Sequence, residues 1–334
     1  MSTTAVIGTT TMTDILNSYS SQDGMANYLY VANILAKKLP LLQHLPMIAS
    51  NQVMSEIVSR VKSMGSASTR NFNEHVAPSA AHREPITERI MMVDDWSEVD
   101  AALYDIQNDP SAWRSDEDSI KVEGMSQTVE DMILNGNLST DPSGLQGILT
   151  RFNVSTVRPN GDTTARYNVQ LAGGSGSGVA SVMFIETGRG KVYGIYPKNS
   201  KAGLDIQNKG KVTSQTSDGL MDVYRTHLQW FLGLVIKDER CVQLIRNIEV
   251  SGSSNIFDSG MASSALRRLP SGGQAPGTIM LVSPSIMDQM DQMADDKQNV
   301  KYEPNEAFGG MVTKYKGIPV YVAEMLDETE TAIS

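Results

Sequence analysis

The sequence contains few of the residues from which reactive sites are usually built. Its 334 residues include one cysteine, Cys241, and only four histidines. A single cysteine excludes an internal disulfide framework and fits a reducing compartment such as the cytoplasm. The sequence has no His-Glu-x-x-His or Cys-x-x-Cys motif to gather metal ligands. We therefore expect no metal centre.

Long apolar runs and an excess of positive charge are also missing. No run approaches the roughly 18 apolar residues that a membrane-spanning helix needs, so we expect no membrane partner. Residues Met1 to Thr13 lack the basic and apolar regions of a cleaved secretion signal. The formal net charge is −10, whereas gripping nucleic acid requires an excess of Lys and Arg. This charge suits a soluble protein that lies beside DNA without sticking to it.

Searches for catalytic motifs give only weak matches. Gly190-Lys191 and Gly210-Lys211 lack the glycine spacing and the following Ser or Thr of a phosphate-binding loop. The run Gly173 to Gly178 contains a literal Gly-x-Ser-x-Gly, but its low complexity favours a linker over a nucleophile elbow. Cys241 lies in an apolar strand, which is typical of a buried small side chain, and His227 is interpreted as hydrogen-bonded structure. The sequence predicts no cofactor and no catalytic residue, so we expect a protein that is not an enzyme.

The first quarter of the chain predicts an arm, a helix and a long hairpin. Residues to about Asp23 are small, polar and aperiodic, as in an extended arm. Apolar spacing predicts a short helix over Asn27 to Leu39, stopped by Pro40 and followed by an apolar linker. From Val53 to Val93, two β-prone runs enclose a turn-rich stretch and carry charges of both signs, which predicts a β-hairpin with little core. Because an isolated two-stranded ribbon is marginally stable, we expect it to lie on a neighbouring molecule.

The middle of the chain predicts helices. A short helix is expected over Val99 to Ile106 and a long one over Ala112 to Asn135, stopped by Asn135-Gly136. Negative side chains near the start of the long helix favour its dipole. The apolar side chains expected on one face of the long helix are Ile120, Met125, Val129, Met132 and Ile133.

The remainder predicts β structure and then alternating elements. Gly188-Arg189-Gly190 indicates a hairpin between Ser181 to Ile185 and Val192 to Tyr196. The strongest strand is Val223 to Ile236, followed by another over Cys241 to Val250. The last third predicts a small α/β unit, with helices at Ile256 to Leu269 and Ser285 to Asp295, and strands at Thr278 to Ser283 and Ile318 to Ala323.

Several stretches, taken in order, resemble a known family. They are Trp96-Ser97-Glu98-Val99-Asp100, Glu123-Gly124-Met125, Asn135-Gly136, Arg151-Phe152-Asn153, Tyr224-Arg225-Thr226-His227 with Gln229-Trp230, Arg246-Asn247-Ile248 and Gly317-Ile318-Pro319-Val320. The chain resembles the major capsid proteins of tailed double-stranded-DNA phages with the Hong Kong 97-type fold, and most closely those of the short-tailed, epsilon-fifteen-like group. The resemblance covers nearly the whole chain and rests on segment order, because none of these stretches is a catalytic motif.

The resemblance implies an α+β fold with an N-terminal arm, an extended hairpin loop, a peripheral domain built on a spine helix, and an axial domain. The implied segments are 1–52 for the arm and short helix, 53–93 for the extended hairpin loop, 94–250 for the peripheral domain with the spine helix at 112–135 and a β-rich segment, and 251–334 for the axial domain and return strand.

The resemblance also implies a function in assembly. Hexamers and pentamers of the chain would form the icosahedral head shell around the genome, in the virion capsid, after assembly in the host cytoplasm. The implied partners are other copies of the chain, a scaffolding protein, a portal and a decoration protein, with packaged double-stranded DNA contacted only non-specifically.

The charges of the hairpin predict where subunits meet. The inter-subunit contacts predicted are Arg60, Lys62, Arg70, Arg83 and Arg89 on the hairpin, facing Asp116, Glu117 and Asp118 on the long helix. Solvated surface charge remains the alternative for some of them. Two other functions also stay open, which are a tail-tube or decoration protein and a hydrolase built on scattered Ser, His and Asp residues.

Overall fold

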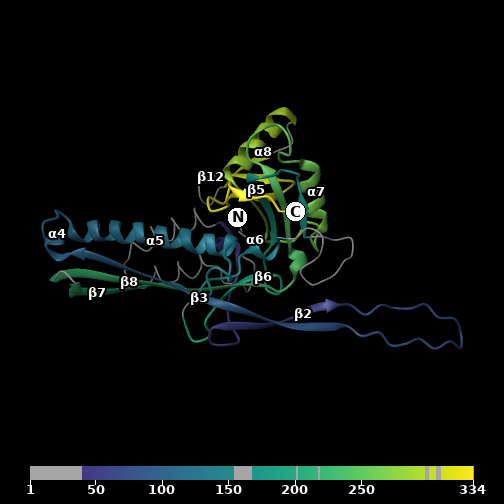
Figure 1. Ribbon diagram of the computed structural model, residues 1–334, viewed down its shortest axis with the longest axis horizontal. Helices are drawn as coiled ribbons and strands as arrows, with labels where there is room; N and C mark the ends of the chain where they lie inside the picture. The colour runs from purple at the N-terminus through teal and green to yellow at the C-terminus, as the bar shows by residue number, and fades with distance from the viewer. Residues whose placement is uncertain are drawn as a thin grey trace.

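The computed structural model describes residues 40–153, 168–200, 202–216, 219–297, 301–305 and 310–333. The arm predicted to Asp23 and the helix predicted over Asn27 to Leu39 lie outside these residues. The described chain is elongated. A long helix and three strands extend to one side of a compact α/β unit, and a thin hairpin extends to the other (Figure 1).

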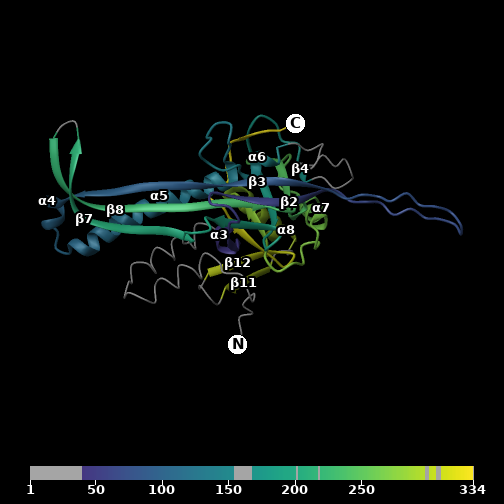
Figure 2. The same cartoon turned by 90° about the horizontal axis from the view of Figure 1, so that it is seen from below.

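One sheet has six strands in the order β1-β6-β8-β3-β2, with β7 also paired to β8. Its strands are β1 (Met47–Ala49), β2 (Ser55–Ser63), β3 (His82–Asp100), β6 (Val192–Tyr196), β7 (Gly203–Thr216) and β8 (Gly219–Ile236). Seen from below, β3, β8 and β7 run side by side in front of the long helix (Figure 2). The short helix α3 (Pro40–His44) precedes β1, so Pro40 begins a helical turn where the sequence had predicted an apolar linker.

β8 is the central strand of this sheet and extends the prediction over Val223 to Ile236. As expected from the alternation of its side chains, one row is buried: Leu228, Trp230, Leu232, Leu234 and Ile236. Near its end the other row is also buried at Val235, so β8 enters a core there. β7, its hairpin partner, was not predicted, because its polar sequence has no apolar alternation.

Helix α5 (Pro110–Asn135) is the predicted long helix and covers one face of β3 and β8. Its start is fixed by Pro110 in the first turn and by the Asp109 carboxylate, which accepts from the Ala112 N–H at 3.1 Å. Gly136 ends it with a φ of −47°. Glycine is needed there for space, since a Cβ would lie 2.3 Å from the Met132 carbonyl oxygen.

The buried face of α5 differs from the prediction at one position. Met125, Val129 and Ile133 are buried as expected, but Ile120 is 64% exposed. The buried row continues backward from Met125 to Val122. Ile120 stands two residues before Val122, about 200° around the helix, and therefore faces solvent.

A second sheet has eight strands in the order β11-β12-β13-β10-β5-β9-β4, with β14 paired to β5. Its strands are β4 (Val169–Leu171), β5 (Ser177–Glu186), β9 (Val242–Glu249), β10 (Thr278–Val282), β11 (Lys301–Asn305), β12 (Gly310–Tyr315), β13 (Ile318–Val322) and β14 (Glu330–Thr331). The predicted helices of this part are α7 (Ser259–Arg268) and α8 (Pro284–Lys297). This sheet therefore combines strands that precede residue 250 in the sequence with strands that follow it.

The second sheet is buried on both faces, which explains the nearly continuous apolar run of β5. Met183 and Ile185 face the larger core, which includes residues of α5 and β8. Val182 and Phe184 face a second core beneath α7 and α8. The predicted hairpin at Gly188-Arg189-Gly190 is therefore wrong, because β5 and β6 belong to different sheets. These glycines turn the chain from one sheet into the other.

Three short elements complete the connections. β3 continues to Asp100, so the helix predicted over Val99 to Ile106 is reduced to α4 (Ala101–Asp105). Helix α6 (Ile148–Arg151) follows α5, and the 3-10 helix η1 (Glu239–Cys241) joins β8 to β9. Cys241 is buried, as predicted.

The last described residues are fastened to the second sheet by a buried ion pair. Arg246 Nη2 donates to Glu330 Oε2 at 2.7 Å, and the Ser181 hydroxyl donates to the same oxygen at 2.8 Å. Asn247 forms two further hydrogen bonds with the backbone of Ile333, at 2.7 and 3.0 Å. Removing one partner of such a pair leaves the other charge buried without compensation.

We predict that Arg246→Met lowers the free energy of unfolding by about 3–5 kcal/mol, because Glu330 then stays buried without its cation. Denaturant unfolding of the purified protein measures this loss. The exposed pair Lys211–Asp222, with its charged atoms 3.7 Å apart, is the control, and Lys211→Met is expected to cost under about 1 kcal/mol. Equal losses in the two variants would contradict the prediction.

Glu130 is a second buried carboxyl group, and no cation among the described residues forms an ion pair with it. It lies on α5 among buried apolar residues, and its Oε1 atom has no hydrogen-bond partner among the described residues. Burial, and then the nearby charge of Glu324, raises the pKa of Glu130 to about 8. The carboxyl therefore keeps its proton in the folded chain over a pH range in which the unfolded chain has lost it.

This pKa shift predicts a pH-dependent stability. Between the unfolded value of 4.5 and about 8, the folded state binds one more proton than the unfolded state, so stability falls as pH rises, by up to about 1.4 kcal/mol per unit. Glu130→Gln should remove this fall in stability with rising pH. It should therefore raise the melting temperature at pH 8 but not at pH 4.5. The exposed Asp288 on α8 provides the control, since Asp288→Asn should keep the original pH profile.

Candidate functional site

The hairpin, residues 55–89, is held at its base by its own subunit. β2 pairs with β3 from Ser55 opposite Arg89 to Ser63 opposite His82. Side chains of such a ribbon alternate between two faces, and one face packs inward. Val58 on that face, with Ile90 just beyond, is buried in a small cluster with Tyr193, Ile195 and Val235.

Two shielded ion pairs reinforce the hairpin base. Arg60 binds the carboxylate of Glu239 and the carbonyl oxygen of Ile236. Arg151 of α6 donates two hydrogen bonds of 2.6 Å to the carboxylate of Glu88, the bidentate geometry that makes Arg–carboxylate pairs strong. The base of the hairpin is therefore rigidly attached, and its direction relative to the body is set.

The opposite face of the hairpin, which we call the outer face, is open to solvent. Its members are Ser55, Ile57, Ser59, Val61, Arg83, Pro85, Thr87 and Arg89. Ile57 and Val61 are among the exposed large hydrophobic residues. The outer face carries two arginines and no acidic residue, whereas Glu56, Glu84 and Glu88 lie on the inward face. The exposed side thus combines apolar and positively charged groups and lacks acidic ones.

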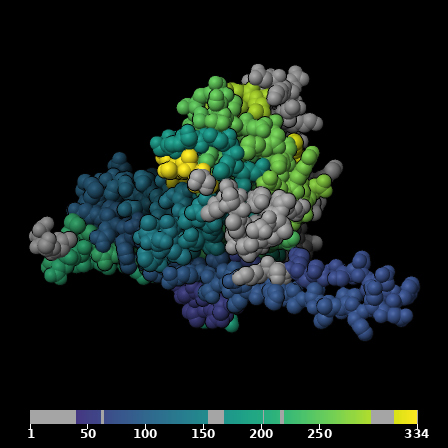
Figure 3. All heavy atoms as spheres, turned by 45° about the vertical axis from the view of Figure 1, so that its right-hand side comes forward, coloured from purple at the N-terminus to yellow at the C-terminus, as the bar shows by residue number. Residues whose placement is uncertain are grey.

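Beyond the paired strands the hairpin becomes a loop without secondary structure, with a hydrogen-bonded turn at its tip. No strand or helix is assigned within 64–81, and the loop projects past the rest of the molecule (Figure 3). At the tip, Glu74 accepts from the Asn71 N–H at 2.9 Å, and Arg70 donates to the Glu74 carbonyl at 3.2 Å. Asn73 has a φ of +66°, a left-handed conformation that asparagine tolerates. This turn presents Phe72, which is 100% exposed.

At the other end of the molecule lies a part that we call the distal arm: residues 92–121 with the facing strands at 205–229. Its core is polar. Arg114 of α5 is buried and donates to the Thr226 hydroxyl at 2.8 Å, and that hydroxyl donates to Asp118 Oδ2 at 2.9 Å. Asp116 on the same helix is exposed and Glu117 is half-buried. The surface of this end also carries large hydrophobic residues, which are Leu103, Ile106, Ile120, Leu220 and Met221.

The predicted contact residues therefore occupy different environments. Arg70, Arg83 and Arg89 are exposed, although Arg89 also donates to the Pro142 carbonyl at 3.0 Å. Arg60 and Asp118 are engaged within their own subunit, while Lys62 lies in β2 with its side chain outside the described ones. The hairpin and the start of α5 extend in opposite directions from the body (Figure 1), so one subunit does not bring the two groups of charges together. Their role between subunits stays a prediction.

A cluster on the open face of the six-stranded sheet was not predicted. Trp96 of β3 stacks on His227 of β8, with ring centroids 4.1 Å apart. His227 Nε2 lies 2.6 Å from Asp94 Oδ1, which agrees with the interpretation of this histidine as hydrogen-bonded structure. The alternation of β3 and β8 was visible in the sequence, but the register that sets Trp96 opposite His227 was not.

Within the described ranges no three His, Cys, Asp or Glu side chains are grouped as a metal site would need. Among the helices of the same ranges, none is long and apolar enough to cross a bilayer.

Comparison with known proteins identifies the family. The family model described as "Major capsid protein GP7" matches residues 22–334, which is most of the chain. This chain belongs to the GP7 major capsid protein family. It is a head-shell subunit of a phage and a component of the virion capsid. A search of curated proteins found no match.

A solved structure shares the fold of this capsid protein. A chain in the cryo-EM structure of bacteriophage epsilon15 matches with a TM-score of 0.62 and 20% identity, covering 86% of this chain and 87% of that chain. The capsid of bacteriophage JBD30 matches with a TM-score of 0.49 and 12% identity, covering 84% and 88%. The similarity to epsilon15 supports the predicted α+β, Hong Kong 97-type fold.

The two faces of the hairpin predict different effects of removing an arginine. Arg60→Met leaves the buried Glu239 without this cation, so we expect a loss of about 3 kcal/mol in the free energy of unfolding of the unassembled subunit. Arg83→Met, on the outer face of the same hairpin, is expected to change it by less than about 0.5 kcal/mol. Urea unfolding of both variants measures the contrast, and equal losses would contradict the assignment of faces.

Proposed function

We propose that subunits of this capsid protein assemble head to tail, with the hairpin of one subunit lying on the distal arm of the next. One observation carries this proposal. The hairpin base is fixed by buried contacts, while its outer face and tip expose Ile57, Val61 and Phe72. A rigidly directed ribbon that exposes apolar side chains gains stability when another surface covers them.

The energy of such a contact comes mainly from apolar burial. Covering a large apolar side chain contributes about 1.5–3 kcal/mol, whereas an exposed ion pair contributes about 0–1 kcal/mol. Phe72 and the apolar residues of the outer face therefore provide most of the affinity. The arginines Arg83 and Arg89, facing acidic residues of the distal arm, provide orientation and a faster encounter. Many such contacts per shell make the assembled particle far more stable than any one of them.

The geometry of this contact leads to closed rings. Two different surfaces meet, one from each end of the subunit, which is a heterologous interface. Such an interface repeats until the rotation closes the ring. Hexamers and pentamers formed in this way are the units from which an icosahedral head shell around double-stranded DNA is built. Family membership supports this structural role over catalysis.

The remaining assignments follow the same proposal. Residues 1–52 serve as the arm and short helix, 53–93 as the extended hairpin loop, 94–250 as the peripheral domain with α5 as its spine, and 251–334 as the axial domain. A scaffolding protein, a portal and a decoration protein are the further partners we propose. The net charge of −10 fits an inner wall along which packaged DNA slides without specific binding.

A charge reversal on the outer face tests the proposal. The double variant Arg83→Glu, Arg89→Glu should fold normally, because both side chains are exposed, but should fail to form closed shells. Electron microscopy of purified particles and a melting curve of the unassembled subunit measure the two effects. Arg60 is left unchanged, since its loss would weaken the fold itself.

The control variant keeps the positive charges and replaces each planar guanidinium with an ammonium group. Arg83→Lys, Arg89→Lys should assemble like the parent protein, because orientation by charge does not need the guanidinium geometry at an exposed site. Closed shells from the glutamate variant at normal yield would remove the outer face from its proposed role.

A further inference from the structure

The Trp96 cluster forms a rigid aromatic surface, which we call the Trp96 platform. Its members are Asp94, Trp96, Glu98, Arg225 and His227. The Trp96 indole stacks on His227 with an interplanar angle of 18°. The Arg225 guanidinium lies 5.6 Å from the centre of the indole ring and is held by Glu98 at 2.5 Å. Each ring or cation that touches the indole is thus fixed by its own carboxylate.

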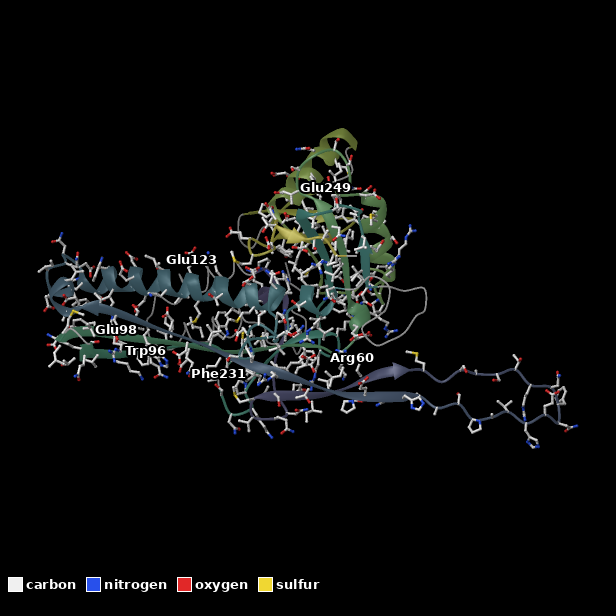
Figure 4. The ribbon with its side chains drawn as sticks, in the orientation of Figure 1. Arg60, Trp96, Glu98, Glu123, Phe231 and Glu249 are labelled. Carbon is white, nitrogen blue, oxygen red and sulfur yellow. The ribbon has the colours of Figure 1, made fainter. Side chains whose placement is uncertain are left out.

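The platform lies on the face of the sheet that α5 does not cover. Thr226 and Leu228, the neighbours of His227 along β8, point toward α5, so His227 and the opposite Trp96 point away from it. Trp96 and Glu98 are labelled on this side of the sheet (Figure 4). Trp96 is 44% exposed and Met92, four residues before it on the same face, is 52% exposed.

A cross-strand pair that only stabilises the sheet explains part of this arrangement. Such a pair contributes about 0.2–1 kcal/mol. It does not explain an indole that contacts two fixed side chains and is still half open to solvent, beside an exposed methionine. Exposed tryptophan held in one rotamer is typical of the centre of a protein interface, because little side-chain freedom is lost on binding.

We infer that the Trp96 platform is the docking site for the hairpin tip of a second copy of this chain, with Phe72 packing against the indole. The inference rests on the head-to-tail contact proposed above and names the face of the distal arm that receives the hairpin. That face is opposite to the one that carries α5 and Ile120.

The tip of the hairpin has the properties that this site needs. Phe72 is fully exposed, and the turn around Glu74 holds it in position. The turn thus presents Phe72 to an approaching surface. The platform and the tip lie at opposite ends of the molecule (Figure 1), so the contact forms only between two copies.

Charge complementarity favours the same occupant. On the face of the sheet that bears the platform, the second half of β3 carries three acidic residues and no basic one, which are Asp94, Glu98 and Asp100. Asp95 lies on the α5 face, beside Lys121. The outer face of the hairpin carries Arg83 and Arg89 without an acid, and Arg70 lies beside the tip. An incoming hairpin thus brings positive charge to a negative strand.

Cysteine pairs test which face of the distal arm receives the tip. The native Cys241 is 1% exposed and adds little background. Phe72→Cys combined with Met92→Cys should give disulfide-linked subunits when assembled shells are mildly oxidised. Phe72→Cys combined with Ile120→Cys, on the α5 face, should give few. Val76→Cys in the same loop replaces Phe72→Cys if that variant forms no shells.

The outcomes separate this inference from the head-to-tail proposal. Cross-links to Ile120→Cys in place of Met92→Cys would overturn the platform assignment but leave head-to-tail assembly standing. Cross-links to neither position, in shells that assemble normally, would overturn both.

A second measurement uses Trp96 itself. Trp96→Ala should raise the subunit concentration needed for shell formation by at least about tenfold, while Trp96→Phe should restore most of the assembly. The melting temperature of the unassembled subunit should fall only slightly in Trp96→Ala, as expected for a half-exposed side chain. Unchanged assembly by Trp96→Ala would contradict the proposal. A loss of assembly accompanied by a large fall in the melting temperature of the unassembled subunit would contradict it as well.

Discussion

The burial of β8 is the interaction on which the rest of this capsid subunit depends. One row of its side chains, which includes Trp230 and Leu234, packs into the core shared with α5 and the second sheet. Both of its edges are hydrogen-bonded, to β3 on one side and to β6 and β7 on the other. One end of β3 pairs with β8 and the other end forms the hairpin with β2. The distal arm contains the other end of β8. The direction of the hairpin and the direction of the distal arm are therefore both fixed by β8.

Much of the fold was predictable because its elements have strong local signals. The alternation of β8, the capped and apolar α5, and the helices and strands after residue 256 all appeared near their expected positions. The errors arose where long-range pairing decides the structure. The glycines at 188 and 190 indicated a hairpin, but β5 and β6 join different sheets. β7 is polar, and only its pairing with β8 makes it a strand.

The candidate site shows the same limit at the level of single residues. Charge and turn composition were enough to predict an exposed hairpin between Val53 and Val93. They did not reveal that Arg60 faces inward to Glu239 while Arg83 faces outward, because this depends on which face of the ribbon meets the body. Trp96 and His227 are separated by more than a hundred residues, and only the register of β3 on β8 brings their rings together. Side-chain direction, more than residue type, decides which groups remain available to a neighbour.

The ion pair between Arg246 and Glu330 has a consequence for synthesis on the ribosome. Arg246 lies in β9, between β5 and the edge strand β4, but the carboxylate that neutralises it arrives more than eighty residues later. Until then a nascent chain holds an uncompensated cation where the sheet must close. A chain that ends before Glu330 lacks the carboxylate that neutralises this cation, so the stability of the second sheet depends on residues made last among those described.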